Sequence, residues 1–253
     1  ELAAVDPEGY GLSVAMHDGY LYSLGDADTE FTIQSVSKPL TYAMALSRLG
    51  PKEVDAKIGV EPSGEAFNQI SVDSRRRPKN PMINAGAIAA TSLVRNTSHG
   101  TRMERILRLH SRCAGRQLRI NKNIQSQEHK AGDRNRALGW MLSSVGIIEE
   151  DPTQALEDYF AQCSVMVDTR DLAIMGATLA AGGRNPFTDE RVMEPVTVER
   201  VLSVMNSCGM YDDAGSHAEG GTVSEDQTLA AVDVRYDLEP DELDRLAGQL
   251  ERL

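Results

Sequence analysis

Cysteine is scarce in this sequence: three thiols occur among 253 residues, at Cys113, Cys163 and Cys208. An odd number of widely separated cysteines argues against a framework of disulfide bonds and indicates a reducing compartment, which we take to be the cytoplasm. Each thiol is therefore expected to be a small buried side chain.

Long apolar runs are also missing. No segment approaches the run of about 18 apolar residues that suggests a membrane-spanning helix. The chain opens with Glu-Leu-Ala-Ala, which lacks the basic and apolar regions of a secretory leader. We expect a soluble protein without membrane insertion, and because no initiator methionine is present we expect part of a longer chain.

Basic residues are in the minority, with 26 Lys and Arg against 38 Asp and Glu and a formal net charge of -12. A surface of this sign repels phosphate backbones and anionic lipids, so nucleic acid is not an expected partner. The one basic cluster, at residues 75–79, is too short to reverse the charge and is interpreted as a solvated loop beside Pro78.

Signatures of metal and phosphate sites are absent. The histidines show no paired spacing with one another, with cysteine or with carboxylates, so neither a metal nor another cofactor is expected. No Gly-x-Ser-x-Gly turn, phosphate-binding glycine loop or Ser-His-Asp triad is indicated either. The five histidines are His17, His99, His110, His129 and His217.

The remaining pattern predicts strands, then many helices, then a late strand. Residues 10–24 read as a hairpin around His17-Asp18-Gly19, and an apolar helix is expected to begin within a few residues of Ser35 and to end at Gly50-Pro51. Further helices are predicted over 87–94, 102–113, 134–145, 152–163, 170–181 (after the capping residues Asp168 and Thr169) and 196–205, followed by a strand over 229–236 and a helix over 240–253.

Ser35 and Lys38 form a Ser-x-x-Lys pattern at the predicted helix start, which places a hydroxyl and an amine on one face. If Lys38 is the base for Ser35, we expect it to lie within hydrogen-bond reach of the serine. A serine hydroxyl attacks a carbonyl only when a base removes its proton, and an amine can do so when burial and a helix N-terminus disfavour its charged form. The pattern occurs by chance in chains of this length. Taken alone, the pattern favours Ser35 as a helix cap and Lys38 as a solvated side chain, because capping is the commoner role of a serine at a helix start.

Seven segments resemble, in the same order, those of serine-dependent glutaminases with a β-lactamase-like fold. The likeness covers about residues 1–218. The segments are 31–39 (FTIQSVSKP), 61–68 (EPSGEAFN), 80–88 (NPMINAGAI), 132–137 (GDRNRA), 159–164 (YFAQCS), 182–186 (GGRNP) and 208–212 (CGMYD).

The resemblance implies hydrolysis of L-glutamine to L-glutamate and ammonia through a γ-glutamyl-serine intermediate. It implies that Ser35 is the nucleophile, that Lys38 is its base, and that Tyr211 lies beside them as a third catalytic group. Ser35 and Tyr211 would also contact the substrate. The other substrate-binding positions implied are Asn84, Glu128, Asn135 and Tyr159.

Free glutamine carries an ammonium and a carboxylate on its α-carbon, and a specific site must pair both groups or leave them desolvated. Glu128 would bind the ammonium, and the amides and hydroxyls would bind the carboxylate. Each residue has a plainer interpretation: Asn84 as a helix cap, Glu128 as a surface partner of Lys130, and Asn135 as a solvated side chain.

Two parts of the family pattern are absent. A Tyr-Ile-Pro that contributes to substrate binding would precede residue 1, and the Lys-Ser-Gly-Val-Gly-Gly-Gly stretch that supplies an oxyanion-hole amide does not follow Tyr211. We therefore expect a glutaminase domain over 1–221, incomplete after about Gly215 and broken between Gly215 and Thr222. Residues 222–253 form a separate β-α segment that weakly resembles the start of an anti-sigma-factor-antagonist (STAS) domain.

The expected fold is α+β: an antiparallel sheet begun by the N-terminal hairpin, the helix of Lys38 against it, and a mainly helical region from Pro51 to Thr197. A homodimer or homotetramer acting on L-glutamine is expected. Two alternatives stay open: a catalytically silent scaffold with a regulatory or binding role, and a penicillin-recognising serine acyltransferase, although no Lys-Thr-Gly or Ser-Asp-Asn is present.

Overall fold

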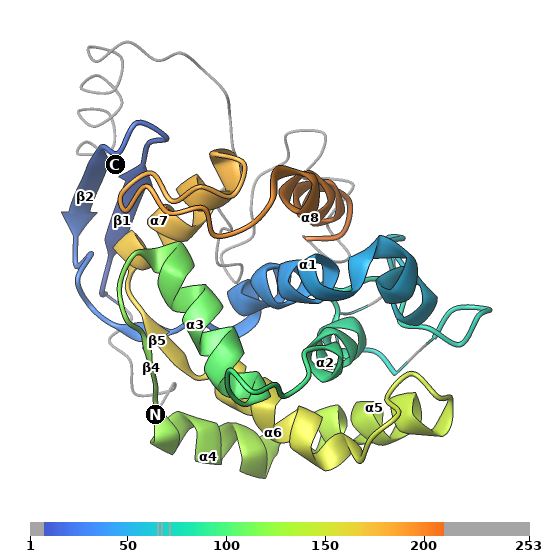
Figure 1. Ribbon diagram of the computed structural model, residues 1–253. Helices are drawn as coiled ribbons and strands as arrows, with labels where there is room; N and C mark the ends of the chain where they lie inside the picture. The colour runs from blue at the N-terminus through green and yellow to red at the C-terminus, as the bar shows by residue number, and fades with distance from the viewer. Residues whose placement is uncertain (1–7, 65, 67, 71, 210–253) are drawn as a thin grey trace.

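The computed structural model describes residues 8–64, 66, 68–70 and 72–209 (Figure 1). In chain order the elements are β1 (Gly11–Ala15), β2 (Leu21–Gly25), β3 (Phe31–Thr32), the 3-10 helix η2 (Gln34–Ser37), α1 (Lys38–Lys57), α2 (Asn84–Leu93), α3 (Arg102–Ala114), β4 (Arg119–Ile120), α4 (Lys122–Ala131), α5 (Asp133–Ser144), α6 (Pro152–Cys163), β5 (Val165–Val167), α7 (Thr169–Ala180) and α8 (Pro195–Cys208). The predicted strand over 229–236, the helix after it and the stretch from Gly215 to Thr222 lie outside the described residues.

The N-terminal hairpin is confirmed. β1 and β2 pair antiparallel, with Gly11 opposite Gly25 and Ala15 opposite Leu21. The connecting turn is closed by a hydrogen bond from Met16 N to Tyr20 O of 2.8 Å, and Gly19 takes a φ of +92° that favours glycine. Helix α7 packs against β1, with the hydroxyls of Ser13 and Thr169 at 2.9 Å (Figure 1).

The helix of Lys38 does not pack against the hairpin, so that prediction was wrong. α1 packs mainly on α2 and α8, because its apolar residues lie on more than one side and need helices around them. The predicted end at Gly50-Pro51 corresponds to a kink: Gly50 has φ +76° and ψ 162°, and the helix resumes up to Lys57. α7, and not α1, is the helix that covers the hairpin.

A second small sheet was not predicted from the sequence. Its antiparallel strands lie in the order β3-β5-β4, with Thr32 opposite Met166 and Ile120 opposite Val165. Ile33 N then donates to Val165 O at 2.8 Å. This pairing ties the segment just before Ser35 to the chain that leaves α6.

Helix α2 lies in the centre of the core, and all ten of its residues are buried. Its first turn packs against the preceding loop so closely that a Cβ on Gly86 would lie 1.8 Å from Asn80 O. Only glycine fits this approach. The Asn80 side chain fixes the same loop by accepting from Met82 N at 2.9 Å and Ile83 N at 3.2 Å.

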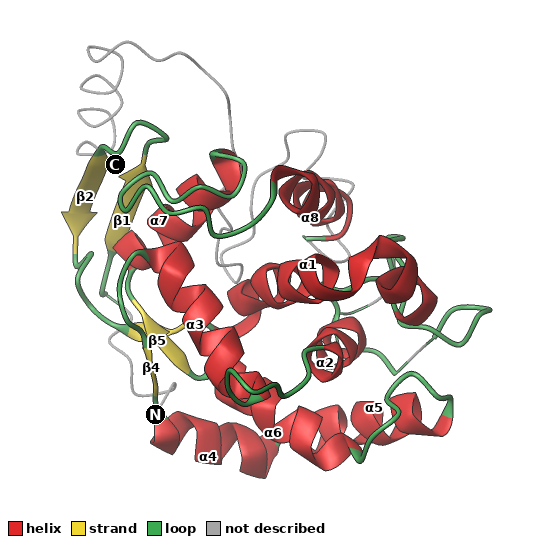
Figure 2. Cartoon of the chain, in the orientation of Figure 1, coloured by secondary structure: helices red, strands yellow, loops and turns green. Residues whose placement is uncertain are grey.

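The fold is a mixed α and β architecture in which helices dominate. Figure 2 shows the strands gathered on one side of the molecule and the helices filling the remainder. In the part of the chain described, no helix combines the length and apolar character needed to cross a membrane.

Candidate active site

Ser35 lies in η2, which runs directly into α1 at Lys38. Ser35 is half-buried, and its carbonyl accepts the backbone N–H of Lys38. Ser37 occupies the N-cap position of α1, without a capping hydrogen bond from its side chain, so the interpretation of Ser35 as the helix cap was wrong. The helix does begin within a few residues of Ser35, as predicted, and Pro39 occupies its first turn.

The Lys38 side chain is 1% exposed, which rules out a solvated lysine. Its Nζ donates to Met82 O at 2.8 Å and to Asn84 Oδ1 at 2.8 Å. The direct hydrogen bond expected between Lys38 and Ser35 is not formed between these two described residues. Lys38 Nζ donates instead to a backbone carbonyl and an amide oxygen, two acceptors that offset the cost of burying this polar group.

Asn84 connects four helices through its side-chain amide. Its Oδ1 accepts from Lys38 and, at 3.4 Å, from the hydroxyl of Tyr159 on α6, while its Nδ2 donates to Asn135 Oδ1 on α5 at 3.0 Å. The N-cap of α2 is Ile83, so Asn84 is not the helix cap that the plainer interpretation suggested. Three predicted substrate-binding residues therefore form one hydrogen-bonded group beside the lysine.

Glu128 lies on α4 and reaches the same region through Gln34. Gln34 Nε2 donates to Glu128 Oε1 at 3.2 Å and to Thr32 Oγ1 at 3.1 Å. Gln34 was not singled out from the sequence, although it directly precedes Ser35. Its φ of +48° is unusual for a residue with a side chain, and this backbone feature is not encoded in any sequence pattern.

The thiol of Cys163, the last residue of α6, is buried near these groups. Burial raises its pKa to about 12, and the smaller influences are the charges of Lys38 and Glu128 and a hydrogen bond with Tyr159. Three predicted site residues from three different helices thus influence the pKa of this thiol. At such a pKa the thiol stays protonated at neutral pH, so Cys163 is unsuited to act as the nucleophile.

Six of the seven predicted site residues are therefore placed. Lys38, Asn84, Asn135 and Tyr159 are joined by hydrogen bonds, Ser35 lies in the turn before Lys38, and Glu128 is joined through Gln34. The seventh, Tyr211, lies outside the described residues. Among those described, no group of three or more His, Cys, Asp and Glu side chains could hold a metal ion.

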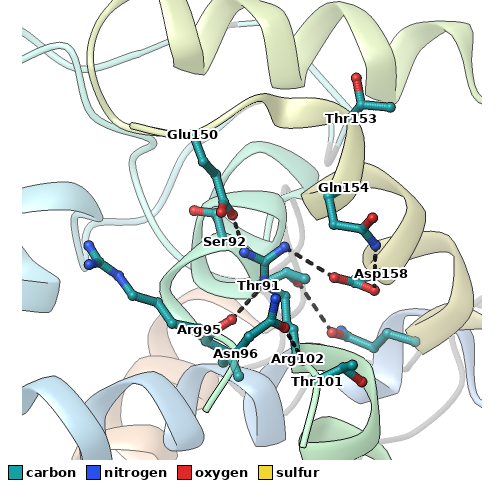
Figure 3. Close-up of polar contacts among 12 residues, drawn as sticks. Thr91, Ser92, Arg95, Asn96, Thr101, Arg102, Glu150, Thr153, Gln154 and Asp158 are labelled. Atoms are coloured by element: carbon teal, nitrogen blue, oxygen red, sulfur yellow. Dashed lines mark hydrogen bonds and ion pairs between the residues drawn. The ribbon is translucent and has the colours of Figure 1, made fainter. Parts of the chain in front are cut away.

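A buried arginine fixes α6 from the side of α3. Arg102 is 2% exposed; its Nη1 donates to Asp158 Oδ2 at 3.1 Å, its Nε donates to Val94 O at 2.5 Å, and it also pairs with Glu150 (Figure 3). Burial raises the pKa of Asp158, and the Arg102 charge opposes this. Arg102 with Val94, Asp158 and Glu150 thus forms a clamp on α6. Asp158 directly precedes Tyr159, so this clamp holds the helix that carries a site residue.

An α+β fold with a half-buried serine just before a helix, and a buried lysine three residues later, corresponds to the β-lactamase-like class. The family model described as Glutaminase matches residues 1–220. The chain belongs to the glutaminase family.

Two curated relatives show the extent of the match. The chain is 47% identical over 215 residues to Glutaminase 1 of Bradyrhizobium diazoefficiens, covering 85% of this chain and 35% of the relative. It is 48% identical over 218 residues to the glutaminase of Corynebacterium efficiens, covering 85% and 52% respectively. The chain thus spans about a third to a half of the length of these relatives.

Solved structures agree with this assignment. The native form of Mglu superposes with a TM-score of 0.80 at 45% identity, over 85% of this chain and 53% of that one. The probable glutaminase YbaS superposes with a TM-score of 0.82 at 38% identity, over 86% and 71%. Mglu has also been solved in a glutamate form. These neighbours establish the β-lactamase-like fold.

Proposed function

We propose that this protein hydrolyses L-glutamine to L-glutamate and ammonia, with Ser35 as nucleophile and Lys38 as its proton carrier. The observation that carries the proposal is the burial of Lys38 one helical turn after Ser35, inside a group of amide and hydroxyl side chains. The glutamate form of Mglu supports an amino acid as the ligand.

In the proposed reaction Ser35 Oγ attacks the side-chain amide carbon of glutamine and its proton passes to the Lys38 amine. The amide C–N bond breaks, the leaving nitrogen takes up that proton, and ammonia departs from a γ-glutamyl ester of Ser35. Water then attacks the ester, which releases glutamate and returns the proton to Ser35. Tyr211 is proposed to take part in these proton transfers.

The substrate's charged groups have matching partners. The Glu128 carboxylate is proposed to bind the α-ammonium. Asn135 uses its Oδ1 to accept from Asn84, and within the described part of the chain its Nδ2 has no hydrogen-bond partner. We propose that this Nδ2 donates to the α-carboxylate, and that the Tyr159 hydroxyl turns from Asn84 Oδ1 to donate to it when substrate binds.

The wider assembly is also a proposal. We propose a cytoplasmic homodimer or homotetramer. The cytoplasmic location is supported by three cysteines that are free and buried. We further propose that residues 1–221 are the glutaminase domain and that 222–253 are distinct from it. Sedimentation equilibrium of the full chain tests the assembly, and a monomer would contradict it.

Glutamine hydrolysis by the full chain, followed through glutamate release, tests the proposed function. Ser35→Ala and Lys38→Met should each abolish nearly all turnover while the circular dichroism spectrum stays unchanged. Lys122→Met is the matched control, because Lys122 is an exposed lysine at the start of α4.

Turnover that survives Ser35→Ala would reject the mechanism. An inactive parent chain would favour a silent scaffold, and nitrocefin hydrolysis would favour a penicillin-recognising enzyme.

A further inference from the structure

The residue before Ser35 has a backbone conformation that needs support. Gln34 has φ +48°, in the left-handed region that residues with a Cβ rarely occupy. Such a conformation persists where surrounding contacts over-determine it. Because the orientation of Ser35 follows from the peptide unit before it, whatever holds Gln34 also aims the Ser35 hydroxyl.

A buried chain of hydrogen bonds reaches the Gln34 carbonyl. Ser37 Oγ donates to Gln34 O at 2.7 Å, and Gln162 Nε2 donates to Ser37 Oγ at 2.9 Å. Ser37 and Gln162 are both fully buried, at 0% exposure. The Ser37 hydroxyl has one proton, so accepting from Gln162 directs that proton to Gln34.

The other end of this series of hydrogen bonds, at Gln162, is anchored in the core. Gln162 Oε1 lies 3.3 Å from Thr91 Oγ1, a donor on α2 that also lies 2.9 Å from Ala87 O. Gln162 follows Tyr159 by three residues on α6, the helix that Arg102 holds through Asp158 (Figure 3). The support for Gln34 therefore comes from the two helices that carry Asn84 and Tyr159.

We propose that Ser37 and Gln162 are positioning residues for the nucleophile: through the Gln34 carbonyl they hold the turn that orients Ser35. Neither contacts the substrate in this proposal, and their effect is on the attack step. The inference rests on the proposed hydrolysis of glutamine for its kinetic readout, while the backbone of Gln34 can be observed independently.

Two variants test it in the full chain. Ser37→Ala removes the donor to Gln34 O, and Gln162→Met keeps the side-chain length but removes the amide that directs the Ser37 proton. Ser164→Ala is the matched control, because Ser164 is a fully buried serine whose hydroxyl also donates to a backbone carbonyl, that of Phe160 at 2.8 Å. Steady-state kinetics are measured well below the unfolding temperature of each variant.

For Ser37→Ala we expect kcat to fall by about tenfold to a hundredfold with little change in KM, because a misplacement of about 1 Å is sufficient for such a loss. Gln162→Met should show a smaller fall of the same kind, and the double variant should lose no more than Ser37→Ala. Ser164→Ala should keep the parent kcat. A kcat that stays at the parent value in both variants, or losses that multiply in the double variant, would overturn the inference.

A crystal structure of Ser37→Ala decides the question without any activity measurement. We expect Gln34 to leave the left-handed region, and a φ that remains near +48° would overturn the inference. If the parent chain does not hydrolyse glutamine, the proposed function fails, and this structure still shows whether Ser37 holds the turn.

Discussion

The side-chain nitrogen Nζ of Lys38 lies 2.8 Å from the side-chain oxygen of Asn84, the first residue of α2. This contact joins the proposed proton carrier to the residues proposed to bind substrate. Asn84→Ala should lower the free energy of unfolding by about 1–3 kcal/mol, because a buried donor loses an acceptor. It should also reduce kcat for glutamine. Urea unfolding and glutamate release measure the two effects, with the exposed Asn123→Ala as control. An unchanged free energy of unfolding would mean that the buried Lys38 does not need the Asn84 side chain as an acceptor.

Glu128→Gln should raise KM for glutamine by about tenfold to a hundredfold, since a charge-assisted hydrogen bond to the α-ammonium becomes a neutral one. The substitution keeps the shape and leaves an oxygen for Gln34 Nε2. Glu157→Gln is the control: Glu157 pairs with His129 of α4 from the neighbouring helix α6. A KM equal to that of the parent would show that the ammonium binds elsewhere.

His110 should make the fold sensitive to acid. The ring is fully buried, both of its nitrogens lack a hydrogen-bond partner among the described residues, and burial lowers its pKa from 6.5 to about 4. The unfolded chain therefore binds a proton at a higher pH than the folded one. The free energy of unfolding is therefore unaffected by His110 above pH 6.5 and decreases as the pH drops towards 4. Between pH 7 and 4.5 the expected loss is about 2 kcal/mol.

His110→Phe removes this titration and keeps an apolar ring in the core. Urea unfolding at the two pH values compares its acid dependence with that of the parent. The parent should lose more stability on acidification than the variant does. Parallel losses in both proteins would show that His110 is not the group responsible.

Arg102→Met should destabilise the fold by about 3–5 kcal/mol, because it leaves the Asp158 carboxylate buried without its cation. Adding Asp158→Asn removes that charge and should recover part of the loss. Arg95→Met is the control; Arg95 pairs with Glu149 at 3.6 Å on the surface and should matter little. Equal effects of the two arginine variants, measured by thermal unfolding, would contradict the clamp.

Local sequence signals were sufficient for the hairpin and for most helices. Turn residues fix the first strand pair, and Asp151-Pro152 and Asp168 mark the starts of α6 and α7, where both aspartates cap the helix. α4 was missed because it buries only Ile124 and so shows no apolar stripe. β5 has three residues, which is too short for any periodicity.

The site was predictable only in part. Resemblance named Asn84, Asn135 and Tyr159, but the hydrogen bonds among them depend on how four helices pack. The support of Ser37 by Gln162 joins residues 125 positions apart, and no spacing rule relates them. The packing of α1 against helices instead of the hairpin is likewise a tertiary outcome, because an apolar helix can bury its face against either partner.

Gly86 gives a means of telling true relatives of this site from chance matches. A side chain there would collide with Asn80 O, so the loop that presents Met82 O to Lys38 can approach α2 only where this glycine stands. Ser-x-x-Lys alone is common in unrelated proteins. A chain that has the serine, the lysine and an asparagine followed two residues later by this glycine can hold its lysine in the same way. The glycine is therefore a more selective marker of this site than the Ser-x-x-Lys pattern.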